Sequence, residues 1–296
     1  MVMEYIPAKH LLHRSKSTEW FGTDHTMNLY RGCCHGCLYC DSRSSCYQNP
    51  DFDRVKAKAD ALRLLRDDLA RKVRSAFITM GSMSDPYNPF ERELQLTRRA
   101  LALIDAYQCG VAVATKSDLI VRDVDLYRLI QDHSPVICKL TVTTADDALT
   151  SKIEPHAPTP TRRLKALEEL SKAGIFSGVL LMPVLPYVED SAENVLSVVD
   201  SAARAGAKFV YAAFGVTMRD GQRDYFLDGL DRAFPGMGER YRKRYGSRYY
   251  CSSPRAKELW ELFSSRCREL GLLYEMKHII SAATRSYEDR QLSFFD

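Results

Sequence analysis

Apolar runs of strand length alternate with amphipathic stretches of helix length along most of this 296-residue chain. Six runs have the near-continuous apolar character of buried strands: residues 27–30, 76–80, 110–115, 136–142, 178–184 and 209–214. Buried strands separated by helices indicate a parallel sheet whose faces are covered by helices. The pattern therefore predicts an α/β fold built from six strand–helix units.

The connecting segments have helical periodicity. In residues 93–107, 160–174 and 191–206, apolar residues recur at intervals of three and four, and the last two segments end at glycine. A closed eight-unit barrel would need two more strands, and the nearest candidate, residues 272–280, reads equally as strand or helix. We therefore predict a partial (βα)6 barrel, with an open doubly wound sheet as the alternative.

The predicted units divide the chain without a linker or repeat. We expect four parts: a 1–24 N-terminal extension, a 25–221 partial barrel, a 222–290 helical C-terminal extension and a 291–296 tail peptide. No run approaches the roughly 20 apolar residues of a membrane helix, and the N-terminus lacks the apolar stretch of a secretory signal. These features predict a cytoplasmic protein without membrane contact. Because cytosolic thiols stay reduced, its nine cysteines suggest metal binding or catalysis.

The stretch RGCCHGCLYC, residues 31–40, follows the first predicted strand. It therefore lies on a loop at the carboxyl end of that strand, where parallel α/β folds place their active sites. Cys33, Cys37 and Cys40 have the spacing CxxxCxxC and could each bind one iron of a 4Fe-4S cluster, which leaves the fourth iron open. The alternative is zinc, which normally takes four ligands, and no second CxxC motif is nearby.

This motif, with Tyr39 just before its last cysteine, resembles the signature of the radical S-adenosylmethionine (SAM) enzymes. The resemblance implies that SAM chelates the open iron through its amino and carboxylate groups. It also implies that one electron breaks the sulfonium bond to give a 5'-deoxyadenosyl radical, which abstracts hydrogen from a substrate. An electron donor such as flavodoxin or ferredoxin is implied, and Tyr39 becomes a candidate catalytic residue.

Within that superfamily, residues 25–215 resemble the spore photoproduct lyase and DNA repair photolyase-like group. The likeness is carried by NLYRGCCHGCLYC, GSMSDPYNPFERE, ATKSDLIVRD and KIEPHAPTPTRRLKAL. It implies SAM contacts on residues after successive strands: Ser84, Asp85, Lys116, Ser117, Thr141 and Thr143. The ammonium of Lys116 would hold the methionine carboxylate, and the hydroxyls would meet the ribose and amino groups. The alternatives are a solvated lysine and threonines that fill strands.

Two positions depart from the lyase pattern. Spore photoproduct lyase has a cysteine just before the Ser-Asp pair that returns hydrogen to its substrate radical, whereas this chain has Ser82 and Met83 there. The lyase also has a tyrosine directly after the last cluster cysteine, where this chain has Asp41. The hydrogen-return relay of the lyase is therefore broken, and the substrate is left open.

Two C-terminal features suggest partners. Residues 238–250, GERYRKRYGSRYY, combine tyrosines with five cations in a mixture typical of nucleic-acid surfaces: Arg240, Arg242, Lys243, Arg244 and Arg248. The alternative is a solvated helix end followed by a packed aromatic turn. The tail resembles the peptide by which bacterial repair proteins dock on the DNA sliding clamp, through Gln291, Leu292, Phe294 and Phe295. Its alternative is packing of both phenylalanines against the barrel.

These observations predict a radical SAM enzyme that acts on DNA or another nucleic acid, as a repair-like lyase or a modifying enzyme. Two other interpretations stay open at this stage. One is a radical SAM enzyme acting on a peptide or small metabolite, and the other is a non-enzymatic metal-binding module.

Overall fold

The computed structural model describes residues 3–72 and 75–292, without the side chains of residues 72 and 288–292. Its main sheet has the strand order β10-β9-β8-β7-β6-β3-β2. The strands are β2 (Leu12–Arg14), β3 (His25–Met27), β6 (Phe77–Met80), β7 (Gly110–Thr115), β8 (Val136–Thr141), β9 (Ser177–Leu181) and β10 (Phe209–Ala212). All except β2 are parallel.

The six parallel strands follow one another in chain order, as in a barrel, whereas a doubly wound sheet reverses its order at a switch point. Within the described residues, the edge strands β10 and β2 do not pair with each other, so the sheet stays open. The prediction of a partial (βα)6 barrel is confirmed.

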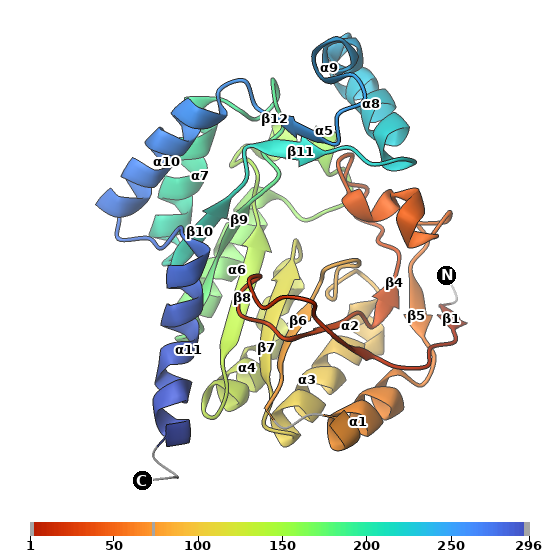
Figure 1. Cartoon of the computed structure of the whole chain (residues 1–296), viewed down its shortest axis with the longest axis vertical. Helices are drawn as coiled ribbons and strands as arrows, with labels where there is room; N and C mark the ends of the chain where they lie inside the picture. Colours follow the sequence, from red (N-terminus) through yellow and green to blue (C-terminus); the bar gives the residue numbers. More distant parts are fainter. Residues whose placement is uncertain (1–2, 73–74, 293–296) are drawn as a thin grey trace.

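Helices cover the outer face of this sheet (Figure 1). They are α1 (Ala61–Lys72), α2 (Glu91–Leu94), α3 (Leu96–Ala106), α4 (Val124–Gln131), α6 (Pro160–Lys172) and α7 (Ala192–Arg204). Helix α5 (Asp147–Ile153) lies at the end of the strands, beside β11 and β12 in Figure 1, and contacts α6. Short 3-10 helices span Asp41–Arg43, Ser45–Tyr47 and Asp118–Asp123. Local sequence sets the helix starts: the hydroxyl of Ser191, for example, accepts a hydrogen bond from the backbone N–H of Asn194 and caps α7.

The first predicted strand, residues 27–30, is wrong in its bounds. The structure has strand β3 at His25–Met27 and a separate strand β4 at Tyr30–Arg31, which belongs to a second sheet. The apolar run continues across both strands because Met27, Leu29 and Tyr30 are all buried, although Met27 lies in the main sheet, Tyr30 lies in the second sheet and Leu29 stands between them. Burial alone therefore did not reveal where the chain leaves the main sheet.

The predicted helix at residues 93–107 is two helices, α2 and α3, separated at Gln95, whose φ is +49°. The cause is the buried carboxylate of Glu91, which accepts hydrogen bonds from the backbone N–H of Thr97 at 3.0 and 3.1 Å. This carboxylate satisfies a donor in the first turn of α3, so the second helix starts there.

The second sheet has the order β1-β5-β4, with β1 at Glu4–Ile6 and β5 at Lys56–Lys58. The predicted N-terminal extension thus supplies β1 to this small sheet and β2 to the edge of the main sheet. Figure 1 shows the N-terminal segment crossing the front of the main sheet. Strands within residues 3–24 therefore pair with both sheets.

The C-terminal part is mainly helical but contains two short strands. Its elements are β11 (Gly215–Thr217), α8 (Gln222–Ala233), α9 (Met237–Tyr245), β12 (Tyr250–Ser252), α10 (Ala256–Glu269) and α11 (Met276–Leu292). Strands β11 and β12 pair antiparallel, and α10 packs against α7 (Figure 1). The ambiguous segment 272–280 forms a bridge between Leu273 and Phe209 of β10, then enters α11.

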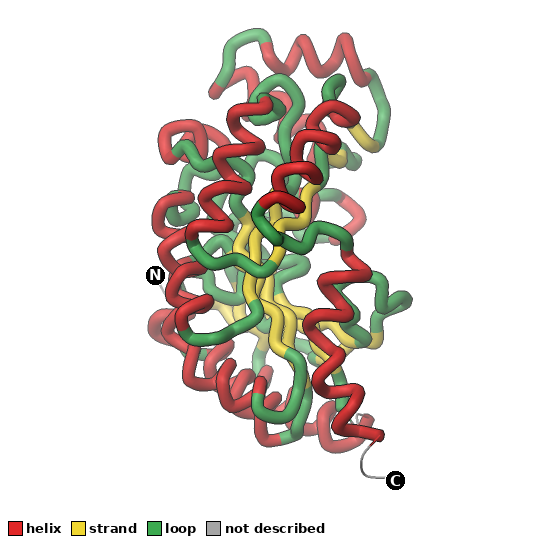
Figure 2. Tube along the Cα trace, turned by 90° about the vertical axis from the view of Figure 1, so that its left-hand side faces the viewer, coloured by secondary structure: helices red, strands yellow, loops and turns green. Residues whose placement is uncertain are grey.

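The amino-terminal half of the barrel interior is filled. Phe21 and Phe77 pack there against Ile279 and Ala283 of α11, which lies on the opposite side of the strands from the outer helices (Figure 2). Lys139 of β8 is fully buried nearby, and its Nζ lies 4.3 Å from the ring centroid of Phe21. The carboxyl half of the interior stays open. In the described chain, no helix combines the length and apolarity needed to span a membrane.

Candidate functional site

A cavity of about 400 Å³ opens at the carboxyl ends of the parallel strands. Its walls come from the cysteine loop, the ends of β6, β7 and β8, the segments 182–183 and 213–217, and Tyr250 of β12. Eight of the residues that the sequence predicted for the site line this cavity: Cys33, Cys37, Tyr39, Cys40, Ser84, Asp85, Lys116 and Thr141. Ser117 and Thr143 are not among the lining residues.

Backbone contacts hold the cysteine loop in a tight curl. The N–H of Cys33 donates to the carbonyl of Phe52 at 2.8 Å, and the N–H of Leu38 donates to the carbonyl of Ile153 at 2.9 Å. Gly36, between the first two ligand cysteines, has a φ of +71°, a conformation that favours glycine. The loop therefore presents three thiols to one cavity from only eight consecutive positions.

The three thiols are enclosed by protein. Burial raises the pKa of Cys33 to about 12, and it also raises the pKa of Cys37 and Cys40. Without a bound metal centre, burial therefore favours the protonated thiol at each of these positions. A bound metal centre deprotonates its cysteine ligands, which offsets this cost of burial.

The donor set fits a 4Fe-4S cluster. In such a cluster each cysteine binds its own iron, so the three sulfurs do not have to meet at one point. A structural zinc ion needs four ligands around a single centre. Over residues 3–72 and 75–292, no group of three His, Cys, Asp or Glu side chains is placed to hold a single metal ion.

A buried ionic network lies behind the cysteine loop. The hydroxyl of Tyr39 donates to the carboxylate of Glu154, which also accepts from the guanidinium of Arg163. Arg163 further donates to the carbonyl of Thr141 at 2.9 Å and so connects this network to the end of β8. Although burial alone would raise the pKa of Glu154, Arg163 and Lys116 lower it. The Glu154 carboxylate therefore stays negatively charged and orients the hydroxyl of Tyr39.

Lys116 follows β7 and brings a cation into the cavity. Its Nζ lies 4.0 Å from Oε1 of Glu154 and 5.3 Å from the ring centroid of Tyr39. Burial would lower the pKa of Lys116, but the neighbouring Cys37 and Glu154 raise it above the usual value. This lysine therefore stays cationic beside the three thiols.

Asp85 joins three parts of the site. Its carboxylate accepts from the hydroxyl of Thr115 at 2.6 Å, from the backbone N–H of Lys116 at 2.8 Å and from the backbone N–H of Tyr87 at 2.8 Å. Nδ1 of the buried His35 lies 3.4 Å from the same carboxylate. Asp85 thus fixes the ends of β6 and β7 against the cysteine loop.

Ser84 and Gly81 shape the turn after β6. The hydroxyl of Ser84 donates to the carbonyl of Tyr30 at 2.9 Å, which ties this turn to β4. Gly81 has a φ of +91°, and a Cβ there would lie 2.0 Å from the carbonyl oxygen of Ala114. Only glycine allows this close approach of the β6 turn to β7.

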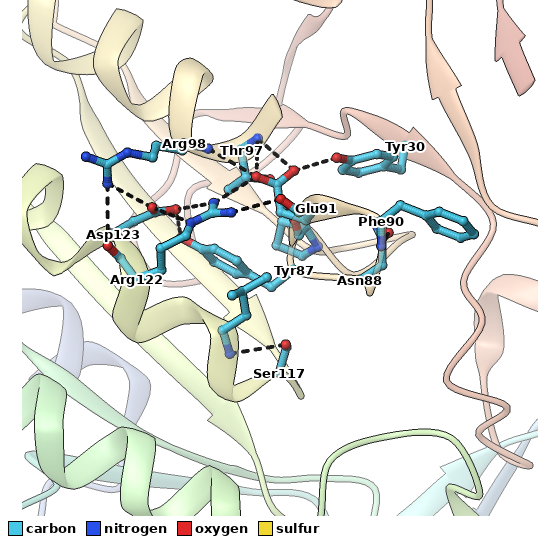
Figure 3. A network of polar contacts seen from close by, with 12 residues as sticks. Tyr30, Tyr87, Asn88, Phe90, Glu91, Thr97, Arg98, Ser117, Arg122 and Asp123 are labelled. Carbon is cyan, nitrogen blue, oxygen red and sulfur yellow. Dashed lines mark hydrogen bonds and ion pairs between the residues drawn. The ribbon is translucent and has the colours of Figure 1, made fainter. Parts of the chain in front are cut away.

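A second buried network supports this turn from the outside (Figure 3). The Glu91 carboxylate accepts from the hydroxyl of Tyr30 and from Nη2 of Arg122, the latter at 2.8 Å. Arg122 also bonds Asp123, which accepts from the hydroxyl of Tyr87 at 3.0 Å. Every carboxylate in this network has a cation or hydroxyl donor, as buried charges require. The turn that carries Ser84 and Asp85 is therefore rigidly held.

The two predicted residues outside the cavity have other partners. The hydroxyl of Ser117 accepts from the backbone N–H of Leu119 and caps the following 3-10 helix (Figure 3). Thr143 lies beside the buried Glu189 carboxyl, whose pKa burial raises to about 8. Both hydroxyls are thus placed for structural contacts.

Several residues at the site were not predicted from the sequence. His35 stands inside the cysteine motif, so its position was a signal that could have been used. Glu154 and Arg163 lie in the quoted segment KIEPHAPTPTRR, yet nothing in the pattern pairs them. Asp41 forms an ion pair with Arg219 at 2.9 Å at the mouth of the cavity. That pair depends on the fold alone, since the residues are far apart in sequence.

Part of the basic segment, residues 238–250, packs against the rest of the protein. Tyr241 and Tyr245 are buried, the Arg240 guanidinium stacks 3.7 Å from the ring centroid of Tyr187, and Arg242 forms ion pairs with two aspartates of α8. The remaining predicted cations are exposed: Lys243, Arg244 and Arg248. Nucleic-acid contact by this segment stays a prediction, with fewer rings available for stacking than the sequence suggested.

The tail peptide lies at the end of the described chain. Gln291 and Leu292 close α11, but their side chains and residues 293–296, which include Phe294 and Phe295, lie outside the described residues. Docking on a sliding clamp therefore stays a prediction.

Comparison with known proteins identifies a family to which this chain is similar. Residues 27–215 match the model of the radical SAM superfamily. An uncharacterized protein of Mycobacterium tuberculosis is 32% identical over 228 residues, which cover 75% of this chain and 67% of that protein. An uncharacterized protein of Methanocaldococcus jannaschii is 31% identical over 169 residues, which cover 57% of this chain and 63% of that protein.

Solved structures share the fold at low identity. Spore photoproduct lyase complexed with dinucleoside spore photoproduct has a TM-score of 0.67 and 14% identity, covering 92% of this chain and 81% of the lyase. The methyltransferase TsrM from Kitasatospora setae has a TM-score of 0.53 and 14% identity, covering 83% of this chain and 51% of TsrM. With the family match across more than half of its residues, this chain belongs to the radical SAM superfamily.

Proposed function

We propose that this protein is a radical SAM enzyme that holds one 4Fe-4S cluster through Cys33, Cys37 and Cys40, cleaves SAM reductively and acts on a nucleic acid. One observation carries the proposal: the three thiols share a single cavity with the cation of Lys116 and the strand end at Thr141. When bound, the cluster supplies the electron that splits SAM into methionine and a 5'-deoxyadenosyl radical.

The side chains of the cavity have distinct tasks in this proposal. Lys116 binds the methionine carboxylate of SAM, because it is the cation among the predicted SAM contacts and its raised pKa keeps it charged. The hydroxyl of Thr141 meets the polar groups of SAM from the end of β8. Ser84 and Asp85 act mainly through backbone geometry, since they hold the turn that forms the cavity wall.

Apolar groups enclose the opposite side of the cavity. Met182, Pro183, Ala213 and Val216 line it from the β9 and β10 ends, and Phe52 lines it from the segment after the cysteine loop. Such walls exclude water from the side of the cavity that faces the cysteine loop.

The two departures from the lyase pattern favour chemistry other than its hydrogen-return route. Asp41 accepts from the Thr217 hydroxyl at 3.2 Å and pairs with Arg219, so it fastens β11 to the cysteine loop. Met83, in the place near the lyase cysteine, is 38% exposed and lines the cavity. A repair-like lyase with another hydrogen source, or a modifying enzyme, is consistent with these residues.

Support for a nucleic-acid substrate comes from the cavity mouth. Arg219 lies 5.3 Å from the ring centroid of Tyr249 and 5.8 Å from that of Tyr47, and Tyr249 and Tyr250 are about half exposed. A cation flanked by exposed rings is the kind of surface on which bases stack. A flavodoxin or ferredoxin as electron donor belongs to the same proposal.

Isotope transfer tests both parts of the proposal. Anaerobically reconstituted, reduced protein is incubated with SAM and a deuterated single-stranded DNA or RNA oligonucleotide. We expect 5'-deoxyadenosine to form and to carry deuterium from the oligonucleotide. If deuterium comes only from a labelled peptide or metabolite, the nucleic-acid assignment is wrong. Absence of 5'-deoxyadenosine under all conditions contradicts SAM cleavage itself.

A further inference from the structure

A second cavity, of about 480 Å³, adjoins the first. It lies between strands β2 and β3 at one edge of the main sheet, the small sheet and the segment 42–52. Four residues line both cavities: Ser42, Phe52, Ser82 and Met83. We call this space the side chamber. Because the two cavities share part of their lining, a group bound in the side chamber lies next to the SAM cavity.

The side chamber is lined by cations and amides but by no carboxylate. Its cations are Arg31 of β4 and Lys58 of β5, and His13 of β2 adds an imidazole. Asn28, Gln48 and Asn49 supply amides, and Tyr47 and Phe52 supply rings. Because none of its lining residues is acidic, this chamber has a positive potential that favours an anionic group.

Strand register explains why these two cations are available. Arg31 is paired in register with Lys56 of the antiparallel strand β5, and Lys58 lies two residues further along β5 on the same face. Lys56 forms an ion pair with Glu4 at 3.0 Å, outside the chamber. Among the described residues, the ammonium of Lys58 has neither a hydrogen bond nor an ion pair.

The two cations also repel each other. Burial and the charge of Arg31 lower the pKa of Lys58, which shows that the guanidinium lies near enough to disfavour a second positive charge. Arg31 donates one hydrogen bond to the carbonyl of Gln48, which is a neutral partner. An anion between Arg31 and Lys58 would remove this repulsion and give Lys58 its missing partner.

We propose that the side chamber binds a backbone phosphate of the substrate nucleic acid between Lys58 and Arg31, while the adjoining nucleotide enters the SAM cavity. This inference rests on the proposed function and adds the site that selects the substrate. The amides and rings favour a nucleotide over an acidic peptide, because bases stack on aromatic side chains and bond to amides.

Lys58 and Lys56 form a matched pair for the test. Both are lysines of β5, but Lys58 lines the chamber and Lys56 is bound to Glu4 outside it. The reconstituted full-length protein, Lys58→Gln and Lys56→Gln are titrated with a fluorescent single-stranded oligonucleotide at several salt concentrations. Lys58→Gln is expected to raise the Kd about tenfold and to reduce the salt slope by about 0.7, the value for one phosphate contact on a single strand.

Lys56→Gln is expected to bind within about twofold of wild type, since it removes a surface charge that already has a partner. Arg31→Gln is a second variant of the chamber and is expected to act in the direction of Lys58→Gln. The proposal is overturned if both chamber variants bind like wild type. It is equally overturned if Lys56→Gln and Lys58→Gln weaken binding to the same extent, because the effect would then be general charge.

Competition identifies the source of the anion. Inorganic phosphate should displace the oligonucleotide from wild type more readily than chloride at equal ionic strength, and this advantage should be lost in Lys58→Gln. If an acidic peptide or free phosphate binds in a Lys58-dependent way but the oligonucleotide does not, the nucleic-acid occupant is wrong. Release of 5'-deoxyadenosine by wild type without oligonucleotide tests the proposed SAM chemistry separately, so the two failures are distinguishable.

Discussion

Replacing Cys37 by serine is expected to reduce the iron content from about four atoms per chain to background and to abolish release of 5'-deoxyadenosine from SAM. The hydroxyl of serine is a hard, weakly acidic ligand, whereas iron–sulfur clusters are held by soft thiolates. Two remaining cysteines leave two irons of the cube without protein ligands. Iron and sulfide analysis after anaerobic reconstitution, together with the visible absorption of the cluster, measures the loss without relying on activity.

The neighbouring thiol provides the matched control. Cys34 is adjacent to the ligand Cys33, but it packs against the hydrophobic core and does not line the cavity. Cys34→Ser is therefore expected to retain the iron and the SAM cleavage of wild type. If Cys34→Ser loses iron while Cys37→Ser keeps it, the assignment of ligands within this loop is wrong.

Replacing Lys139 by methionine is expected to raise the free energy of unfolding at pH 7 by between about 2 and 5 kcal/mol. Lys139 is fully buried on β8, and within the described chain its Nζ has no hydrogen-bond partner. Burial lowers the pKa of Lys139 from 10.5 to about 7. Methionine keeps a similar length of apolar chain against Phe21 and carries no group that must be desolvated.

The gain in the free energy of unfolding that Lys139→Met brings should shrink as the pH rises. In the folded protein Lys139 is deprotonated above about pH 7, but in the unfolded chain it keeps its proton up to 10.5. Below pH 7 the wild type bears the whole penalty, and between pH 7 and 10.5 its stability recovers by about 1.4 kcal/mol per pH unit from this group. The difference between Lys139→Met and wild type is therefore expected to fall by about 2 to 3 kcal/mol from pH 7 to pH 9.

Urea denaturation of the holo proteins at both pH values measures this difference. Lys165, an exposed lysine on α6, is the control site, and Lys165→Met is expected to stay within about 0.5 kcal/mol of wild type at both values. A Lys139→Met variant that is less stable than wild type at pH 7 would show that the ammonium has a solvating partner in the protein.

Periodicity predicted the strand–helix units because each central strand is buried on both faces. Strands β7 and β8 coincide with the predicted runs to within a residue, since Gly110–Thr115 and Val136–Thr141 are almost wholly buried. The errors lie where tertiary contacts override local pattern. The chain leaves the main sheet after Met27, where the single polar residue Asn28 stands within a buried apolar run. Glu91 divides one amphipathic helix by capping the next.

The sequence also predicted the cysteine loop, because ligand spacing is local information. Lys116 and Thr141 line the cavity as the strand-end argument expects, but Ser117 turns away to cap a 3-10 helix. The pairing of Glu154 with Tyr39 and Arg163 depends on how β8 and its loop meet the cysteine loop. The side chamber likewise depends on strand register: Lys56 and Lys58 look alike in sequence, and only the pairing of β1 with β5 separates them.

The central claim is that three thiolates hold a cluster with one iron open to SAM. Electron paramagnetic resonance of the reduced protein, recorded before and after addition of SAM, tests it most directly. We expect a cluster signal whose g values change when SAM binds, because the open iron gains new ligands. An unchanged signal, or a protein that contains zinc bound entirely by its own side chains, would show that no iron is open to SAM.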